Sequence, residues 1–227
     1  MFNIKLAGEH AIIIYFGDQI APELVEKISF YSQQLTDGLA DLIIDIVPSY
    51  TSLMVSYKLD FVGYEDFRKQ VEDILVTKSF VSGLIHSKLI EIPVYYGLDV
   101  GLDLAQLLID KDLHLEQFID IHSATDYLVY AIGFSPVFAF LGELDPRLHS
   151  ARLITPRIRI PAGSVGIADN QTAVYPVASS GGWNIIGKTP IDLSINNNEN
   201  IKRFSVGDKV KFVPISQQEF LLLGGLL

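Results

Sequence analysis

The sequence predicts an α+β domain over residues 1–86, followed by a closed or nearly closed β-barrel over residues 87–227. Two observations lead to this expectation. In the first part, short apolar runs with strand character alternate with two segments of helical periodicity. Beyond residue 133 helical periodicity is lost, and glycine and proline separate short apolar runs as far as residue 187. This texture is typical of a barrel with many tight turns.

The first part has the order strand, strand, helix, strand, strand, helix, which predicts an antiparallel sheet with helices on one face. Pro22 marks the start of the first helix, because proline is favoured at the first helical position. Residues 77–88 are the expected hinge to the second part. The predicted elements are a hairpin at 4–17, a helix at 22–35, two strands within 42–58 that part at Pro48, and a helix at 64–75.

The second part begins with a strand and two short helices before the barrel-like texture starts. Residues 194–200, rich in asparagine, predict a polar loop, and a Gly-Asp turn leads into the last strand. No helix is expected beyond residue 133. The predicted elements are a strand at 90–97, helices at 102–109 and 113–124, a strand at 126–134 and a final strand at 206–215.

The composition excludes several classes of function. The chain carries 17 Lys and Arg against 27 Asp and Glu, a formal net charge of −10, which disfavours sequence-independent binding of nucleic acid. Its one basic stretch runs from Arg147 to Arg159. The absence of cysteine excludes disulfides and thiolate metal sites, and the apolar run 11–16 is too short for a secretory core or a membrane span. We therefore expect a cytoplasmic protein that binds neither nucleic acid nor a membrane.

Residues 182–189, GWNIIGKT, have the spelling of a phosphate-binding loop, G-x-x-x-x-G-K-T. Such a loop needs a buried strand before it and a helix after it, so that backbone N–H groups point at the phosphates. Neither flank fits, because the preceding residues are small and polar and Pro190 disfavours helical geometry at Thr189. We therefore expect a strand over 183–188 instead.

Several residues have two interpretations from the sequence alone. His122, near a predicted helix end, is either a cap or core histidine or an acid or base near neutral pH. Asp145 before Pro146 is either a turn residue or, with Arg147, part of an anion site. Ser164 lacks the strand-to-helix setting of a nucleophilic serine. The five histidines have no metal-binding spacing, so no metal site is expected.

Further along the chain, Arg157 and Arg159 alternate with isoleucines, so on a strand both arginines point to one face. That face is either a solvated exterior or a cationic lining. Gln171 and Thr172 are candidates for hydrogen bonds to an amide or lactam. Trp183, the sole tryptophan, either walls a pocket or packs in the core.

Three motifs resemble one protein family. They are YAIGFSPVFAFLGELDPRL at 130–148, TPRIRIPAGSVGIADNQTAVYP at 155–176 and SGGWNIIGKTP at 180–190. The family includes the B subunit of bacterial 5-oxoprolinase, the KipI-type inhibitors of sporulation histidine kinases, and the allophanate hydrolase subunit 1 region of urea carboxylases. IEIPVYYG at 90–97 and the terminal GDKVKFVPI match as well, so the resemblance covers nearly the whole chain.

The resemblance implies a small α+β N-terminal domain and a cyclophilin-like β-barrel. It also implies that the chain is the B subunit of an enzyme that opens the lactam of 5-oxoproline to glutamate. Such a subunit is inactive alone and acts with an A-like and a C-like subunit, with which it shares ATP and Mg. His122, Asp145 and Arg157 are then the catalytic candidates. The residues expected to bind substrate or nucleotide are Arg147, Arg159, Gly163, Ser164, Gln171, Thr172, Gly182, Trp183, Lys188 and Thr189.

Two alternative functions fit the same motifs. One is a KipI-like inhibitor that binds a sensor histidine kinase, and the other is a carboxyltransferase-type subunit that acts on a urea-like amide. The chain also departs from the family pattern. Val137 and Asp169-Asn170 stand where glycines are usual, Phe140 replaces a tyrosine, and Lys188 replaces an arginine. Because valine disfavours positive φ, we expect Val137 to disfavour close approach of the backbone to a ligand.

Overall fold

The computed structural model describes residues 2–82 and 87–227. Contacts divide the chain into two compact units, Met1–Ser87 and Lys88–Leu227, and each is described by itself. The expected hinge at 77–88 includes residues 83–86, which lie outside the described residues. No helix of the described ranges combines the length and the apolar character that crossing a bilayer requires.

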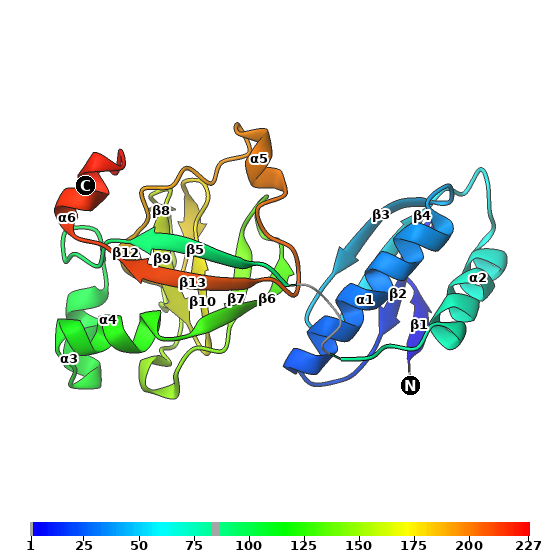
Figure 1. Cartoon of the computed structure of the whole chain (residues 1–227), viewed down its shortest axis with the longest axis horizontal. Coiled ribbons are helices and arrows are strands. Elements are labelled where there is room, and N and C mark those ends of the chain that lie inside the picture. Colours follow the sequence, from blue (N-terminus) through cyan, green and yellow to red (C-terminus); the bar gives the residue numbers. More distant parts are fainter. Residues whose placement is uncertain (1, 83–86) are drawn as a thin grey trace. The chain divides into compact units, whose positions relative to one another are not determined.

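The N-terminal unit is a four-stranded antiparallel sheet with two helices (Figure 1). In chain order its elements are β1 Asn3–Leu6, β2 Ala11–Tyr15, α1 Pro22–Leu39, β3 Ile43–Pro48, β4 Ser52–Tyr57 and α2 Tyr64–Thr77. The strand order is β1-β2-β4-β3. The predicted sequence of strands and helices, with Pro22 at the helix start and a break after Pro48, is confirmed.

One face of this sheet carries the core. Along β4, Leu53, Val55 and Tyr57 are buried and alternate with more exposed residues, as the two-residue period of a strand requires. Both helices contribute to the same core cluster as these strands. Tyr57 stacks on Phe67 of α2 with ring centroids 4.4 Å apart. The helices therefore cover one face, as the pattern predicted.

The C-terminal unit is built around a seven-stranded sheet that curls into a nearly closed barrel. Its strands are β5 Leu89–Val94, β6 Asp126–Ile132, β7 Ala139–Gly142, β9 Ser164–Ala168, β10 Gln171–Val174, β12 Asn184–Lys188 and β13 Lys209–Pro214. The strand order is β12-β9-β10-β7-β6-β13-β5, and only the β13–β5 pair is parallel. The predicted barrel-like sheet is confirmed.

The two edges of this sheet meet at a seam formed by Tyr95 and Lys188. The N–H group of each donates a hydrogen bond of 2.9 Å to the carbonyl oxygen of the other. Gly187 is required there, because a Cβ atom at this position would lie 2.8 Å from the Tyr95 carbonyl oxygen. The segment Gly187-Lys188-Thr189 therefore lies at the end of β12, and no helix follows it directly. The interpretation of this segment as a strand is confirmed.

Two helices of this unit were predicted and two were not. Helices α3 (Leu104–Lys111) and α4 (Leu115–Ser123) match the expectation. The expectation of no helix beyond residue 133 is wrong, because α5 (Asn198–Ile201), α6 (Gln217–Leu222) and a 3₁₀ turn η1 (Pro146–Leu148) follow. These helices are too short to show periodicity. Ser216 and Glu219 form a capping box that starts α6.

A separate two-stranded antiparallel sheet, here named the ribbon, pairs β8 (Arg157–Ile160) with β11 (Ser179–Gly181). Ile160 points inward from the ribbon and is fully buried. It joins a small aromatic cluster with Phe138, Tyr175 and Trp183, distinct from the main core of the barrel. The ribbon and this cluster form the part of the unit that positions the candidate site.

Candidate functional site

A pocket of about 310 Å³ lies in the C-terminal unit beside the ribbon. Its lining draws on all three motifs that carry the family resemblance, and five of its side chains are aromatic. A concave, mostly apolar pocket with a few polar groups is the usual form of a small-molecule site. The lining residues are Phe134, Phe138, Phe140, Arg152, Pro156, Tyr175, Ser180, Gly181, Gly182 and Trp183.

The aromatic walls are held by edge-to-face contacts centred on Phe138. Its ring centroid lies 5.2 Å from that of Phe134, 5.3 Å from Tyr175 and 5.8 Å from Trp183, with interplanar angles of 66°, 80° and 88°. Such pairs add about 0.5–1.5 kcal/mol each beyond area burial. Trp183 is 5% exposed, so it both packs in the core and walls the pocket, and the two interpretations of this residue are compatible.

The loop 133–138 brings Phe134 and Phe138 to the pocket. Two of its residues have a backbone conformation with positive φ, which glycine favours. Phe134 and Val137 both have φ of 68°. For a β-branched residue this conformation costs about 1–2 kcal/mol. Val137 keeps it because its side chain is buried in the main core of the barrel. Val137 thus adopts a positive φ although valine disfavours it, and it is not among the residues that line the pocket. Its expected effect on the approach of the backbone to a ligand stays a prediction.

The opposite wall is the ribbon strand β11 with Gly182. A Cβ atom at Gly181 would clash with the Tyr175 hydroxyl and lie 2.9 Å from Ile160 Cδ1, so glycine is needed for the ribbon to approach the aromatic cluster. The Gly182 carbonyl accepts a 2.7 Å hydrogen bond from the Leu153 N–H. This bond fixes the segment that carries Arg152 against the pocket wall.

Two buried hydroxyl oxygens near the pocket, those of Ser135 and Ser179, have no hydrogen-bond partner within the described part of the chain. Ser135 belongs to the loop 133–138 and Ser179 to β11, the two segments that build the opposite walls. Buried polar atoms without a partner are uncommon in folded proteins. Neither serine is among the residues that line the pocket, so both oxygens are enclosed within the segments behind it.

Arg152 is the charged residue of the pocket lining, and the sequence did not single it out. Its guanidinium lies 5.9 Å from the Trp183 ring centroid, a cation–π distance. Its ion pair with Asp169 is long, at 3.7 Å, and both side chains are more than half exposed, so solvent screens the pair. The guanidinium fork thus remains available to an anion. The available signal was its place in the basic stretch 147–159.

Arg157, a catalytic candidate, forms a bidentate ion pair with Asp103 at 2.9 Å and 2.6 Å. The same carboxylate accepts a 2.6 Å hydrogen bond from the Ile185 N–H. Arg157 thereby fastens the ribbon to the start of α3 and to β12. Asp103 was missed, because nothing in its local sequence indicates a partner 54 residues away.

Asp145 and Arg147, for which an anion site was one of two interpretations, bind each other. The Arg147 guanidinium donates to both carboxylate oxygens at 2.9 Å and 2.8 Å, and the Arg147 N–H donates at 2.9 Å. The side-chain hydrogen bond from Arg147 is the main cause that lowers the pKa of Asp145 to about 2. A carboxylate of such low pKa is a poor proton carrier near neutral pH, so the geometry favours the turn interpretation.

His122 lies at the end of α4 and is fully buried. Its Nδ1 is 2.7 Å from the Tyr96 hydroxyl and its Nε2 is 3.0 Å from Thr172 Oγ1. Its ring also stacks on Phe212 at 4.8 Å. Burial lowers the pKa of His122 to about 3. These contacts favour the core-histidine interpretation for His122 and place Thr172, a binding candidate, in the same buried chain.

The structure brings Gly163, Lys188 and Thr189 together around a second cavity, of about 240 Å³, at the barrel seam. The chain segment 224–226 forms part of its lining, and Lys188 Nζ donates a 2.6 Å hydrogen bond to the Leu226 carbonyl. Burial lowers the pKa of Lys188. Glycine is required at 163 by its φ of 80°, and because a Cβ atom there would lie 2.7 Å from the Thr189 carbonyl oxygen.

The remaining candidates are dispersed. Ser164 is buried in β9, and Gln171 is half-buried at the start of β10. Arg159 is exposed on β8, where the adjacent Ile158 is exposed as well. Of the predicted binding residues, Gly182 and Trp183 therefore line the aromatic pocket, and Gly163, Lys188 and Thr189 surround the seam cavity.

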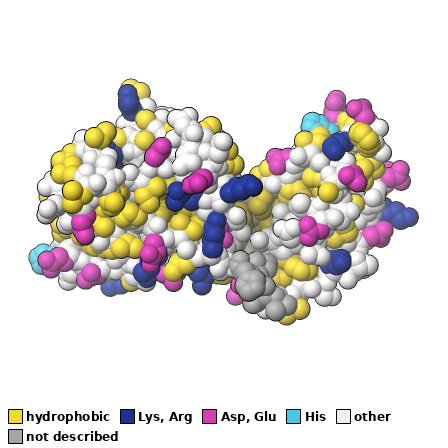
Figure 2. All heavy atoms as spheres, turned by 45° about the horizontal axis from the view of Figure 1, so that its top comes forward, with side chains coloured by type: hydrophobic (Ala, Val, Ile, Leu, Met, Phe, Trp, Pro, Cys, Tyr) yellow, Lys and Arg dark blue, Asp and Glu magenta, His cyan; other side chains and the backbone are white. Residues whose placement is uncertain are grey.

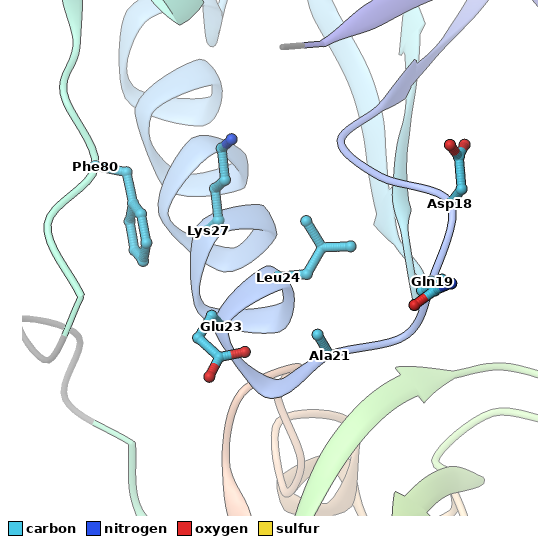
Figure 3. A pocket seen from close by; sticks show the side chains of 7 residues that line it. All are labelled: Asp18, Gln19, Ala21, Glu23, Leu24, Lys27 and Phe80. Atoms are coloured by element: carbon cyan, nitrogen blue, oxygen red, sulfur yellow. The ribbon is translucent and has the colours of Figure 1, made fainter.

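The N-terminal unit has an open hollow of about 520 Å³ beside the start of α1 (Figure 3). Leu24 and Phe80 form apolar walls, while the carboxylates of Asp18 and Glu23 point away from each other (Figure 3). Its charged groups therefore do not converge on one point. Among residues 2–82 and 87–227, no group of three His, Asp or Glu side chains is arranged to hold a metal ion.

Comparisons with known proteins agree with the resemblance in the motifs. Proteins named as the B subunit of 5-oxoprolinase are 34% identical in Bacillus subtilis (strain 168), covering 96% of this chain and 95% of the relative, and 44% identical in Haemophilus influenzae, covering 93% and 97%. The structure resembles the crystal structure of TTHA0988, with a TM-score of 0.79 and 28% identity, over 91% of this chain and 40% of that one.

The Kluyveromyces lactis urea carboxylase shares the fold, with a TM-score of 0.75 and 16% identity over 97% of this chain and 22% of that one. The family model described as "Carboxyltransferase domain, subdomain C and D" matches residues 2–202. Because that match covers most of the chain and the curated relatives align along nearly their whole length, this chain belongs to the carboxyltransferase domain, subdomain C and D family.

Proposed function

We propose that this chain is the B subunit of a 5-oxoprolinase, which opens the lactam of 5-oxoproline to glutamate together with A-like and C-like subunits. Three relatives that match more than nine-tenths of the chain are named as the B subunit of 5-oxoprolinase. The observation that carries the proposal in the structure is the aromatic pocket with Arg152 at its wall. The absence of cysteine is compatible with a cytoplasmic complex.

The pocket matches the chemistry of this substrate. 5-Oxoproline is a small five-membered lactam with one carboxylate. Its ring faces are apolar and fit between aromatic side chains such as Phe138 and Trp183, and its carboxylate is the planar anion that an arginine fork binds in bidentate fashion. The volume of about 310 Å³ is at the low end of the range for ligand pockets, as a small substrate requires.

The residues of this chain do not fit Mg-ATP. The Gly-Lys-Thr segment is a strand at the barrel seam, where its N–H groups at Lys188 and Thr189 already bond to Tyr95 and Gly163. No acidic cluster suited to Mg²⁺ exists among the described residues. In this proposal ATP binds to the partner subunits, and this chain binds, orients and desolvates the lactam. The chain alone is then inactive, because the phosphorylation of the amide oxygen requires the partners.

The test uses the complex of this chain with the A-like and C-like subunits of the same organism, assayed for 5-oxoproline-dependent ATP hydrolysis and glutamate release. Replacing the exposed Arg152 by glutamine should raise KM for 5-oxoproline roughly 10- to 100-fold, because a charge-assisted hydrogen bond contributes about 1.5–3 kcal/mol. Arg68→Gln, at a half-buried arginine of α2 that pairs with Glu72 and does not line the pocket, is the control and should leave KM unchanged.

A second substrate separates carboxylate recognition from general damage. The lactam 2-pyrrolidinone lacks the carboxylate, so the wild-type complex should prefer 5-oxoproline strongly, and Arg152→Gln should remove most of that preference. An unchanged preference in a folded variant would contradict the assignment of Arg152. A complex that forms but hydrolyses no ATP in response to 5-oxoproline would contradict the proposed function itself.

A further inference from the structure

The polar groups of the aromatic pocket distinguish it from the rest of the surface, since apolar side chains are spread over much of the visible face of the C-terminal unit (Figure 2). In a pocket with mostly apolar walls, a few placed polar groups fix the orientation of the ligand. Arg152 supplies the positive charge of the lining. A further donor in the lining is the hydroxyl of Tyr175, to which the proposed function assigns no role.

The Tyr175 hydroxyl lies at the wall that the ribbon provides. A Cβ atom at Gly181 would clash with this hydroxyl, so the oxygen lies directly against a glycine that itself lines the pocket. The Tyr175 ring is held by edge-to-face contacts with Phe138 at 5.3 Å and with Phe134 at 6.4 Å. The hydroxyl is therefore fixed where the ribbon meets the aromatic walls.

This hydroxyl is placed to donate a hydrogen bond. Burial raises the pKa of Tyr175, and it outweighs the opposing effects of a backbone hydrogen bond from Trp183 and of the charges of Arg152 and Arg157. The phenol therefore keeps its proton near neutral pH. Because the Trp183 N–H group already donates to the phenol oxygen, the O–H group is left to serve as the donor. Within residues 2–82 and 87–227, no oxygen accepts that proton.

Arg152 and Tyr175 provide two donors that are held at the same tryptophan. The Arg152 guanidinium lies 5.9 Å from the Trp183 ring centroid, while the Trp183 backbone binds the Tyr175 oxygen. 5-Oxoproline carries two acceptors, a carboxylate and a carbonyl oxygen, on the two ring carbons next to its nitrogen. The charged donor suits the carboxylate, and the neutral hydroxyl suits the carbonyl oxygen. The two donors thus match the two acceptors of one small ring.

We propose that the Tyr175 hydroxyl donates a hydrogen bond to the lactam carbonyl oxygen while Arg152 binds the carboxylate, so that the two residues together orient the ring between the aromatic walls. The inference rests on the proposed function for the identity of the substrate. Tyr175 then determines specificity for the lactam group. A cyclic acid without the carbonyl leaves a buried hydroxyl unpaired, and an unpaired polar group in a binding site disfavours the analogue that causes it.

Trp183 makes the test direct, because the sole tryptophan of the chain lines this pocket and its fluorescence reports occupancy there. Two probes each carry one of the two groups: 2-pyrrolidinone has the lactam alone, and cyclopentanecarboxylate has the carboxylate alone. With the full chain, Tyr175→Phe should weaken binding of 2-pyrrolidinone about 2- to 10-fold, the loss of one neutral hydrogen bond, and leave the dissociation constant of cyclopentanecarboxylate unchanged. Arg152→Gln should weaken binding of cyclopentanecarboxylate alone. Tyr57→Phe, at an equally buried tyrosine of the N-terminal unit, is the matched control and should change neither.

Cyclopentanecarboxylate also verifies that the pocket of Tyr175→Phe is intact, because the substitution keeps the aromatic ring. Equal weakening of both probes in that variant, wild-type binding of 2-pyrrolidinone to it, or no binding of either probe to the wild-type chain would overturn the inference. Turnover of 5-oxoproline by the complex tests the proposed function separately. Turnover with an unchanged KM in Tyr175→Phe would contradict only the role of Tyr175, whereas the expected probe pattern without turnover would support that role and contradict the proposed enzyme.

Discussion

His122 sits in a chain of hydrogen bonds that fixes its tautomer. The Thr172 hydroxyl donates to the Gly166 carbonyl at 3.1 Å, so its oxygen accepts from His122, and Nε2 carries the ring proton. Nδ1 then accepts from the Tyr96 hydroxyl. Each donor and acceptor in this chain is used once, and the imidazole is neutral. Protonation of the ring would place two donors, Nδ1–H and the Tyr96 hydroxyl, against each other in a buried setting.

This arrangement predicts acid sensitivity. The pKa of His122 is lowered from 6.5 to about 3 in the folded chain by burial. The unfolded chain therefore takes up this proton first as pH falls, so the free energy of unfolding decreases from pH 6.5 toward pH 3, by up to about 1.4 kcal/mol per pH unit. Urea unfolding at a series of pH values between 7 and 5, where few carboxylates titrate, measures the slope.

The comparison uses slopes, because a substitution at a buried position also lowers stability at every pH. His122→Gln should flatten the dependence on pH above 5. His10→Gln, at an exposed histidine, is the matched control and should keep the wild-type slope. An unchanged slope in His122→Gln would show that the ring is not held neutral by its surroundings.

Single residues also show where prediction from the sequence stopped. The alternatives for Asp145 depend on whether Arg147 turns back along the chain or outward, and only the three hydrogen bonds between them decide this. Arg152 and Arg157 lie in the same basic stretch of the sequence. Arg152 nevertheless lines a pocket, whereas Arg157 is bound by Asp103. The partner of an arginine is a long-range property, which a local pattern does not contain.

At the scale of elements, the ribbon depends on one long-range ion pair. Asp103 is 11% exposed and Arg157 is 29% exposed at the side chain, so the pair is partly desolvated and is reinforced by the Ile185 N–H. Removing one member leaves the other partly buried and unpaired, which costs more than the loss of an exposed pair. The ribbon in turn supplies a wall of the aromatic pocket.

We therefore expect Asp103→Ala to lower the free energy of unfolding by about 2–4 kcal/mol, measured by guanidinium denaturation. Asp126→Ala, which removes the more exposed pair with Lys211 in the same unit, should cost no more than about 1 kcal/mol. A double-mutant cycle with Arg157→Ala should give a coupling of at least about 1 kcal/mol. Equal losses in the two single variants would show that the ribbon is held by other contacts.

For the whole molecule, the order of the long elements was predictable because apolar residues recur with the period of a helix or of a strand along each of them. Strand alternation and helical periodicity identified the N-terminal sheet and its helices, and glycine spacing identified the barrel. The features that the sequence did not predict are short helices and contacts between residues far apart in the chain. Helices α5 and α6 have four and six residues, too few for a period, and closure of the barrel by Tyr95 and Lys188 joins residues far apart in the sequence.

The cores of the two units predict independent folding. The cluster of the N-terminal unit contains residues between Ile4 and Leu75, and those of the C-terminal unit contain residues between Ile92 and Phe212. Each unit thus has its own hydrophobic core, which is the physical requirement for a domain. We expect the fragment 88–227 to fold alone, with dispersed amide signals in its NMR spectrum and a cooperative unfolding transition.

Core substitutions in the full chain make this prediction sharper. Ile14 and Ile167 are both fully buried, one in each unit. Ile14→Ala should lower the stability of the N-terminal unit by about 2–5 kcal/mol, the usual loss for such a truncation, and leave native-state hydrogen exchange in the barrel strands unchanged. Ile167→Ala should do the reverse. If either substitution accelerated exchange equally in both units, the chain would unfold as one cooperative body, and the separate cores would not define separate domains.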